Sequence, residues 1–189
     1  MKDLEQKLNY KFNNVALLEN ALTHSSYANE VRNGLTSNER LEFLGDSVLS
    51  VIVASYLFEN FKTTLEGELT KLRASLVCEK SLCGFANELE LGSFLRLGHG
   101  EELMGGRERP SILADAFEAV LAAIYLDGGI EPATKFVLGF VIKALEHVEN
   151  APFKDYKTLL QEIVQKNPEE RLTYVLVGES GPDHDKRFE

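Results

Sequence analysis

The chain has 189 residues, 44% of them hydrophobic, which excludes a disordered chain and allows one substantial domain beside a smaller one. Its 30 acidic and 20 basic residues give a net charge of −10, which argues against a general polyanion-binding surface. Carboxylates gathered in one site could still hold divalent cations, so the charge alone does not decide the partner.

Neither cysteine pattern nor hydropathy indicates an exported or membrane protein. Cys78 and Cys83 form no disulfide framework or metal-ligand pattern, so we expect free thiols. The N-terminal sequence MKDLEQKLNYKF is charged and lacks the apolar core of a signal peptide. The longest apolar run, 47–58, is shorter than the roughly 20 residues that span a bilayer. We therefore expect a cytoplasmic protein that contacts no membrane.

Up to about residue 150 the apolar spacing predicts helices throughout, so the expected fold class is mainly α. Polar or glycine-rich stretches at 29–37 and 97–112 are expected to be loops, the second of them mobile. The expected helices cover 3–8, 14–24 capped by Asn13 or Asn14, 38–60 capped by Asn38, 66–89, 111–129 after a Ser111 cap, and 132–150 opened by Pro132.

The pattern changes after residue 150. We expect a first domain at 1–150, a linker at 151–154 and a second domain at 155–189. In the second domain, 155–167 has the pattern of an amphipathic helix, and 171–180 alternates like a strand. The turn GPDHDK then leads into RFE, the expected start of a second strand. One helix and one hairpin cannot close a core, so we expect this α/β domain to be incomplete.

Carboxylates recur inside the two most apolar helical segments. Glu39, Glu42 and Asp46 are spaced i, i+3, i+7, and Asp115 and Glu118 are spaced i, i+3, so each set lies along one helix face. If the two helices pack side by side, four or five carboxylates converge. Oxygen-only ligation of this kind suits Mg²⁺, with Mn²⁺ as a substitute.

Each acid alone also has a purely structural interpretation, as an exposed helix-start residue or half of a salt bridge. Arg40, Lys71 and Arg73 are possible partners. For Glu39 both interpretations stay open, and Glu66 is either a helix-start acid or a supporting residue of the site. For the other four acids the apolar surroundings favour a shared site.

Other chemistries find less support in the sequence. It contains no Glu-x-x-His pair of the kind found in di-iron bundles, no Gly-x-Ser-x-Gly elbow and no phosphate-loop pattern, and we expect no organic cofactor. A Ser-His-Asp arrangement is not excluded by sequence. His24 in LTHSSY fits a structural, hydrogen-bonding histidine better than a catalyst.

The segment NERLEFLGDSVL resembles the signature of bacterial ribonuclease III, an endonuclease specific for double-stranded RNA. The resemblance covers nearly the whole chain in the family's order. It continues through LTHSSYANE, EGELTKLRASLV, LGHGEE, ILADAFEAVLAAIYLDGG and DYKTLLQE, the last of which resembles the opening of a double-stranded-RNA-binding domain. The resemblance implies an all-helical ribonuclease III endonuclease domain, followed by a truncated α/β RNA-binding domain without its last strand and second helix.

Carried over by position, the resemblance implies that Glu42, Asp46, Asp115 and Glu118 are metal ligands, and that Asp46 and Glu118 have catalytic roles. It implies that Glu39 and Glu66 are supporting acids and that the protein is a homodimer with Phe43 at the interface. For Phe43, an ordinary core position stays open as an alternative.

The activity implied is Mg²⁺-dependent, two-metal hydrolysis of double-stranded RNA, leaving 5′-phosphates, 3′-hydroxyls and short 3′ overhangs. Ribosomal RNA precursors, with some messenger and transfer RNAs, are the implied substrates. His184, in the turn of the second domain, and Lys186 are candidate RNA contacts, or else an exposed loop histidine and a solvated charge.

Two other functions remain as alternatives. A protein that binds double-stranded RNA without cleaving it would be expected to lack the carboxylates, which are all present here. A helical metalloenzyme acting on small phosphorylated substrates would leave the segment 155–189 unexplained.

Overall fold

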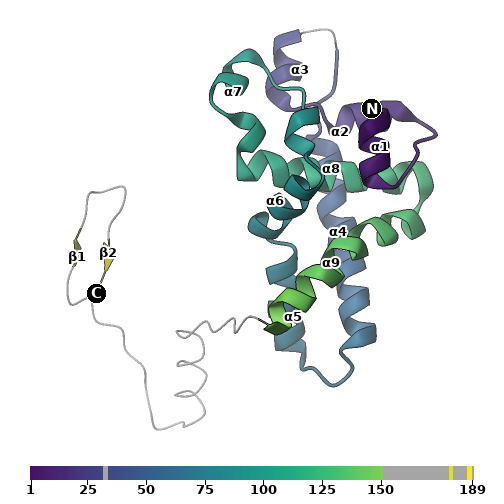
Figure 1. Ribbon diagram of the computed structural model, residues 1–189, viewed down its shortest axis with the longest axis vertical. Coiled ribbons are helices and arrows are strands. Elements are labelled where there is room, and N and C mark those ends of the chain that lie inside the picture. Colours follow the sequence, from purple (N-terminus) through teal and green to yellow (C-terminus); the bar gives the residue numbers. More distant parts are fainter. Residues whose placement is uncertain (32–33, 151–178, 181–186, 189) are drawn as a thin grey trace. The chain divides into compact units, whose positions relative to one another are not determined.

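The computed structural model describes residues 1–31, 34–150, 179–180 and 187–188. The chain divides into two units, Met1–His147 and Val148–Glu189, and each is described by itself. The first unit is built from helices (Figure 1), which confirms the expected fold class. Its elements are α1 (Lys2–Leu8), α2 (Val15–Ala21), α3 (Ser25–Val31), α4 (Glu39–Asn60), α5 (Glu66–Leu76), α6 (Glu79–Glu88), η1 (Leu91–Phe94), α7 (His99–Leu103), η2 (Gly106–Glu108), α8 (Pro110–Gly128) and α9 (Ile130–Asn150).

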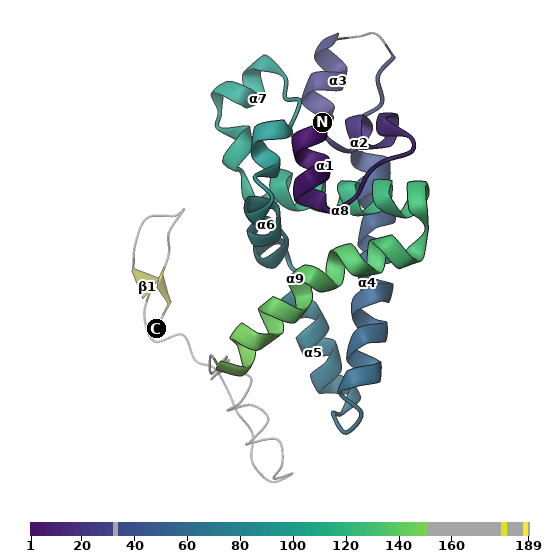
Figure 2. The same cartoon turned by 45° about the vertical axis from the view of Figure 1, so that its right-hand side comes forward.

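Helix α8 is the centre of the first unit. It packs against α2, α4 and α6, and both views show it surrounded by other helices (Figures 1 and 2). A helix that is apolar on nearly every side must be covered on nearly every side, which is the arrangement seen here. Its buried residues are Ile112, Leu113, Ala114, Ala116, Phe117 and the run Ala119–Ile124.

The most extensive contact between described helices joins α4 to α8. At its centre Gly45 lies directly on the backbone of Glu118, and a Cβ atom at Gly45 would collide with the Glu118 carbonyl oxygen. Glycine inside a helix costs about 1 kcal/mol relative to alanine, so this contact must compensate for a poor helix former. The close approach fixes Glu42 and Asp46 of α4 next to Asp115 and Glu118 of α8.

Helix α4 also has the length and hydropathy of a membrane span, with a mean hydropathy of 1.6 over 18 residues. The core helix of a soluble protein can meet the same criterion, and α4 packs on α8. This helix, Glu39–Asn60, is longer than the apolar run 47–58, which alone is too short to span a bilayer. Its outer face carries the apolar stripe, which we define as Phe43, Val51 and Phe58, with exposed fractions of 77%, 60% and 76%.

Two short backbone connections fix the start of α4. Thr23 and Arg96 form an isolated parallel β-bridge, and the Asn38 N–H donates to the Thr23 carbonyl (2.8 Å). Thr23 and Asn38 are both buried. The segment around Thr23 therefore ties the N-terminal end of α4 to the chain that leads into α7.

The expected loop at 29–37 is wrong at its beginning, because α3 covers Ser25–Val31. Serine and asparagine are weak helix formers, so tertiary contacts explain this short helix better than propensity does. The hydroxyl of Ser26 accepts a hydrogen bond from the Gly98 N–H (2.9 Å), and Glu30 accepts one from the His99 N–H (2.7 Å).

The single helix expected at 66–89 is also wrong, because the chain divides at Val77 and Cys78 into α5 and α6. Cys78 is extended (φ −75°, ψ 156°). The Ser75 carbonyl accepts hydrogen bonds from two side chains, the Ser81 hydroxyl (2.7 Å) and the Cys78 thiol (3.3 Å). These side chains replace the backbone N–H that a continuous helix would supply.

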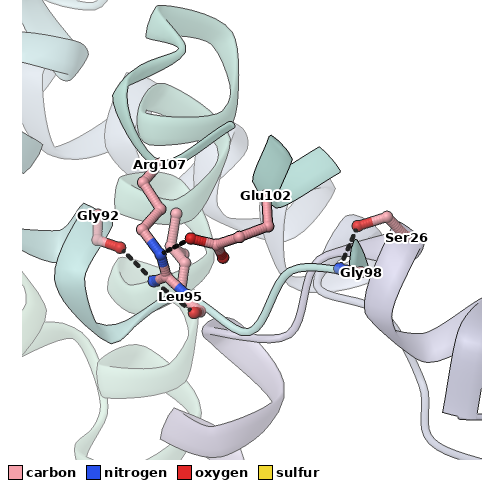
Figure 3. A network of polar contacts seen from close by, with 6 residues as sticks. All are labelled: Ser26, Gly92, Leu95, Gly98, Glu102 and Arg107. Atoms are coloured by element: carbon pink, nitrogen blue, oxygen red, sulfur yellow. Dashed lines mark hydrogen bonds and ion pairs between the residues drawn. The ribbon is translucent and has the colours of Figure 1, made fainter. Parts of the chain in front are cut away.

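The expected mobile loop at 97–112 instead contains α7 and η2 and is held by Arg107 (Figure 3). The Arg107 Nη1 donates to the carbonyls of Gly92 and Leu95 (2.8 Å each), and the Arg107 Nε donates to the Glu102 carboxylate (2.6 Å). Three charge-assisted hydrogen bonds from one guanidinium order this segment just before α8 begins.

The helix starts and caps expected from the sequence are confirmed only in part. Asn14 caps α2 by accepting from the Ala16 N–H (3.2 Å), as expected. Asn38 precedes α4 but makes no capping side-chain hydrogen bond to the described residues. Helix α8 begins at Pro110 rather than after a Ser111 cap, and α9 begins at Ile130, two residues before Pro132.

In the second unit, β1 (Glu179–Ser180) pairs antiparallel with β2 (Arg187–Phe188). This confirms a strand ending at 180 and a second strand beginning at 187. The expected helix 155–167, the strand residues 171–178 and the turn at 181–186, with His184 and Lys186, lie outside the described residues.

Replacing Gly45 by alanine should lower the free energy of unfolding by about 1–3 kcal/mol or more, because the methyl group forces α4 away from α8. Gly84→Ala is the matched control: Gly84 lies inside α6, and a Cβ there would meet no described atom within 4 Å. Alanine at 84 should be neutral or stabilising by up to roughly 1 kcal/mol. Chemical denaturation measures both, and equal effects would contradict the close-contact explanation.

Candidate metal centre

Glu42 of α4 and Asp115 and Glu118 of α8 form one cluster, which we call the carboxylate cluster. One oxygen from each lies within 4.8 Å of the others, and all three side chains are half-buried. Because Gly45 fixes α4 against the backbone of Glu118, the i, i+3 spacing on each helix brings these acids to one place. The convergence expected from the sequence is therefore present for three acids.

Glu118 is the most strongly perturbed member of the carboxylate cluster. Burial, followed by the negative charges of Asp46, Glu42 and Asp115, raises its pKa to about 8. The charges that act on Glu118 all belong to other carboxylates, so no lysine or arginine of the described chain compensates it. Like charges gathered in a partly desolvated place favour the protonated form unless a cation joins them.

The other two acids are shifted in the same direction. Burial first, then the charges of Asp115, Glu39 and Asp46, raise the pKa of Glu42. Burial also raises the pKa of Asp115, His24 opposes this shift, and Glu79 adds to it. Glu79 is the first residue of α6 and a nearby acid that the sequence did not connect to the cluster.

The remaining predicted acids lie at different distances from this centre. Asp46 is exposed, and although its charge acts on Glu42 and Glu118, it is outside the group of three. Glu39 is exposed and accepts a hydrogen bond from the Ser37 hydroxyl (2.9 Å), so its two interpretations remain open. Glu66, in the first turn of α5, accepts a hydrogen bond from Thr70 (3.0 Å), and its charge is not among those that shift the cluster acids.

An oxygen-only cluster of this kind fits a divalent cation. Three carboxylates with mutually close oxygens offer the negative charge and the oxygen donor atoms that Mg²⁺ or Mn²⁺ takes. The exposure of Asp46 leaves one acid on the solvent side, where water and a phosphate could enter.

Gly45 and Glu79 are the site-forming residues that sequence reasoning missed. A glycine in the middle of an apolar helix signals close backbone approach, and this signal was available in EFLGDS. Glu79 had no such signal, since its position depends on the break between α5 and α6.

Without metal, the protein should lose stability as the pH rises from about 4.5 to about 8. Over this window the folded Glu118 keeps its proton while the unfolded side chain has released it, so unfolding releases a proton and becomes easier at higher pH. In EDTA, Glu118→Gln should flatten this dependence and stabilise the protein at pH 8.5 by roughly 1–3 kcal/mol.

Thermal unfolding across this pH range provides the measurement. Glu68→Gln, which neutralises an exposed acid of α5, is the control and should leave the slope unchanged. A wild-type stability that rises between pH 5 and 8 without metal would contradict the shift.

Comparison with known proteins assigns the family. The model of the family described as Ribonuclease-III-like matches residues 14–145. Ribonuclease 3 of Caldanaerobacter subterraneus subsp. tengcongensis is 55% identical over 186 residues, covering 98% of this chain and 82% of that protein.

Two solved structures of the nuclease domain of ribonuclease III from Campylobacter jejuni superpose with TM-scores of 0.70. One is 46% identical and covers 82% of this chain and 98% of its own, and the other is 48% identical and covers 75% and 96%. The structure at 48% identity concerns structural flexibility in a region involved in dimer formation. The chain therefore belongs to the ribonuclease III family of endoribonucleases.

Proposed function

We propose that this endoribonuclease hydrolyses phosphodiester bonds of double-stranded RNA with Mg²⁺, which Mn²⁺ can replace. Glu42, Asp46, Asp115 and Glu118 are the proposed ligands. The single observation that carries the proposal is the carboxylate cluster, because it joins three acids from two helices and the charges acting on Glu118 all come from other carboxylates. A bound divalent cation would lower the pKa of an attacking water and offset the charge of the phosphate.

The proposed catalytic roles of Asp46 and Glu118 follow from their different surroundings. Glu118 is half-buried and held by α8, so its carboxylate is preorganised and needs a cation to stay ionised at neutral pH. Asp46 lies one turn beyond Glu42 on the exposed side of the same helix, so it can reach a water or a phosphate oxygen. Glu39 and Glu66 are proposed as supporting acids on the ground of the family resemblance.

The products and substrates are proposed from the same family membership. They are 5′-phosphate and 3′-hydroxyl ends with short 3′ overhangs, produced by a two-metal reaction on ribosomal RNA precursors and some messenger and transfer RNAs in the cytoplasm. The net charge of −10 does not oppose RNA cleavage, since cations bound by acids make an acceptor for phosphate. The second domain, including His184 and Lys186, is the proposed source of affinity for A-form RNA.

The apolar stripe on α4 supports the proposed homodimer. Phe43, Val51 and Phe58 lie on the helix face turned away from α8 and keep more than half of their surface exposed. Large exposed apolar side chains in a row are typical of an interface rather than of a free surface. One of the Campylobacter jejuni nuclease-domain structures concerns a region involved in dimer formation, which supports the proposal of the same kind of assembly here.

Duplex RNA of several hundred base pairs, incubated with the protein, should be cut in Mg²⁺ and remain intact in EDTA. Asp46→Asn and Glu118→Gln should each reduce the cleavage rate at least 10³-fold, on the order expected for loss of a group that stabilises the transition state, while duplex binding persists. Gel electrophoresis and a filter-binding assay measure cleavage and binding.

One control variant and one contradicting outcome make this test specific. Glu68→Gln changes the same charge at an exposed site on α5 and should cleave like the wild type. RNA that stays intact in Mg²⁺ with a dimeric, duplex-binding wild type would favour the non-cleaving alternative.

Phe43→Asp together with Val51→Asp should convert the dimer to a monomer, because two charges would be buried where apolar surface is expected. Leu103→Asp is the matched control, since Leu103 is 74% exposed on α7, outside the stripe. Sedimentation velocity gives the masses. A wild type that is monomeric at micromolar concentration, or a double variant that stays dimeric, would refute the assignment of this face.

A further inference from the structure

Helices α3 and α7 differ from the other described α-helices of the first unit, because neither contains a buried residue. Each of the others buries at least one apolar side chain. On α7, Leu103 is 74% exposed, and Met104, which caps the end of the helix, is 75% exposed. Burial of an apolar face supplies most of the stability of a helix in a protein, so α3 and α7 must be held mainly in another way.

The two helices contact each other more than they contact the core. Among the described elements, the main neighbour of α3 is α7, and the main neighbours of α7 are α3 and the adjacent η2. Both views show α3 and α7 side by side at one end of the first unit (Figures 1 and 2). We call α3 and α7 together the outer pair.

Two hydrogen bonds join the helices of the outer pair. Ser26 Oγ and the Glu30 carboxylate, one turn apart on α3, accept the N–H groups of Gly98 (2.9 Å) and His99 (2.7 Å) at the start of α7. Figure 3 shows the first of these contacts. The fit is close, since a Cβ at Gly98 would lie 2.7 Å from the Glu30 carboxylate. Neither helix can leave its place alone without breaking both hydrogen bonds.

Two ion pairs fasten α7 to the segment that precedes α8. Glu102 accepts from Arg107 Nε (2.6 Å), and Glu101 lies 2.7 Å from Arg109 Nη1. The side chains of the first pair are 41% and 37% exposed, and Arg109 is 38% exposed. Ion pairs with this exposure stabilise a protein only modestly, and salt weakens them. The attachment of the outer pair is therefore polar and open to solvent.

We propose that the outer pair opens as one local unit while α4 and α8 remain folded. Segments that combine few buried apolar contacts with partly exposed polar contacts are those that open locally at low free energy. The hydrogen bonds from Gly98 and His99 to α3 couple the two helices, so that they open together. The buried residues Leu97 and Gly106 lie on either side of α7 and mark where the opening stops.

This movement is independent of the proposed nuclease activity. It would leave the carboxylate cluster assembled, because the contact between Gly45 and the Glu118 backbone includes neither α3 nor α7. The boundary of the opening unit nevertheless lies next to the start of α4. Thr23, two residues before α3, is buried and accepts the Asn38 N–H (2.8 Å). The outer pair is thus a movable element beside the helix that carries Glu42.

Amide hydrogen exchange in the variant Glu102→Ala, followed residue by residue by NMR, tests the coupling. The substitution removes the α7 partner of Arg107 and leaves the other hydrogen bonds of that arginine in place. The reporter is the Ala28 amide of α3, which donates to the His24 carbonyl (3.2 Å). Its exchange should become roughly two- to fivefold faster, the effect of losing one exposed ion pair.

Glu108→Ala is the matched control, because Glu108 is an exposed acid of η2, just outside the outer pair. It should exchange like the wild type at every amide of α3 and α7. Faster exchange in α7 of Glu102→Ala, with an unchanged rate at Ala28, would show that the helices open separately and would overturn the proposal.

A salt series on the unaltered protein keeps the proposal testable if a variant fails to fold. Raising NaCl from about 0.1 M to about 1 M screens the exposed ion pairs. Relative to amides of α8, the amides of Ala28 in α3 and of Met104, which donates to the Gly100 carbonyl (3.2 Å), should exchange faster by the same factor. Exchange as slow as that of α8, or salt factors that differ between the two helices, would contradict joint opening.

Discussion

Gly45 rests on the backbone of Glu118, and the position of every acid in the site depends on this contact. Helices that meet through larger side chains lie 8–10 Å apart at their axes, and a glycine allows a closer approach. Here the approach brings the face of α4 that carries Glu42 onto the face of α8 that carries Asp115 and Glu118. A methyl group at Gly45 would push α4 away from α8 and so increase the distance between the acids of the two helices.

The site combines a rigid support with an unfavourable charge distribution. Helix α8 is buried along most of its length, so Asp115 and Glu118 cannot move apart to relieve their repulsion. Burial is the first cause of the raised pKa values at all three members of the carboxylate cluster, and the charges of nearby acids add to it. Functional sites often carry such a cost, which a bound cation would remove.

The surrounding contacts serve to keep that arrangement in place. Arg107 orders the chain that enters α8, and Thr23 fixes the start of α4. Ser26 joins these two regions by contacting both Gly98 and the His24 ring. The predicted loop at 97–112 and the segment from Thr23 to Ser26 therefore stabilise the two helices that carry the acids.

Helical periodicity was sufficient to predict the apolar helices and the acids that share their faces. It could not show that Glu42 lies inside the cluster while Asp46 remains exposed, because both satisfy the same spacing. Nor could it locate α3 or the break at Cys78, since side-chain hydrogen bonds to distant or later residues stabilise both. Local patterns predict helix faces, and tertiary contacts decide which residues on a face meet.

The central claim is that acids of α4 and α8 share one divalent cation. Anomalous diffraction at the manganese edge, from crystals soaked in Mn²⁺, tests it most directly. The account predicts a peak bounded by Glu42, Asp115 and Glu118, absent from crystals of Glu118→Gln treated in the same way. A soaked wild-type crystal with no peak among these three residues, or with its main peak elsewhere, would contradict it.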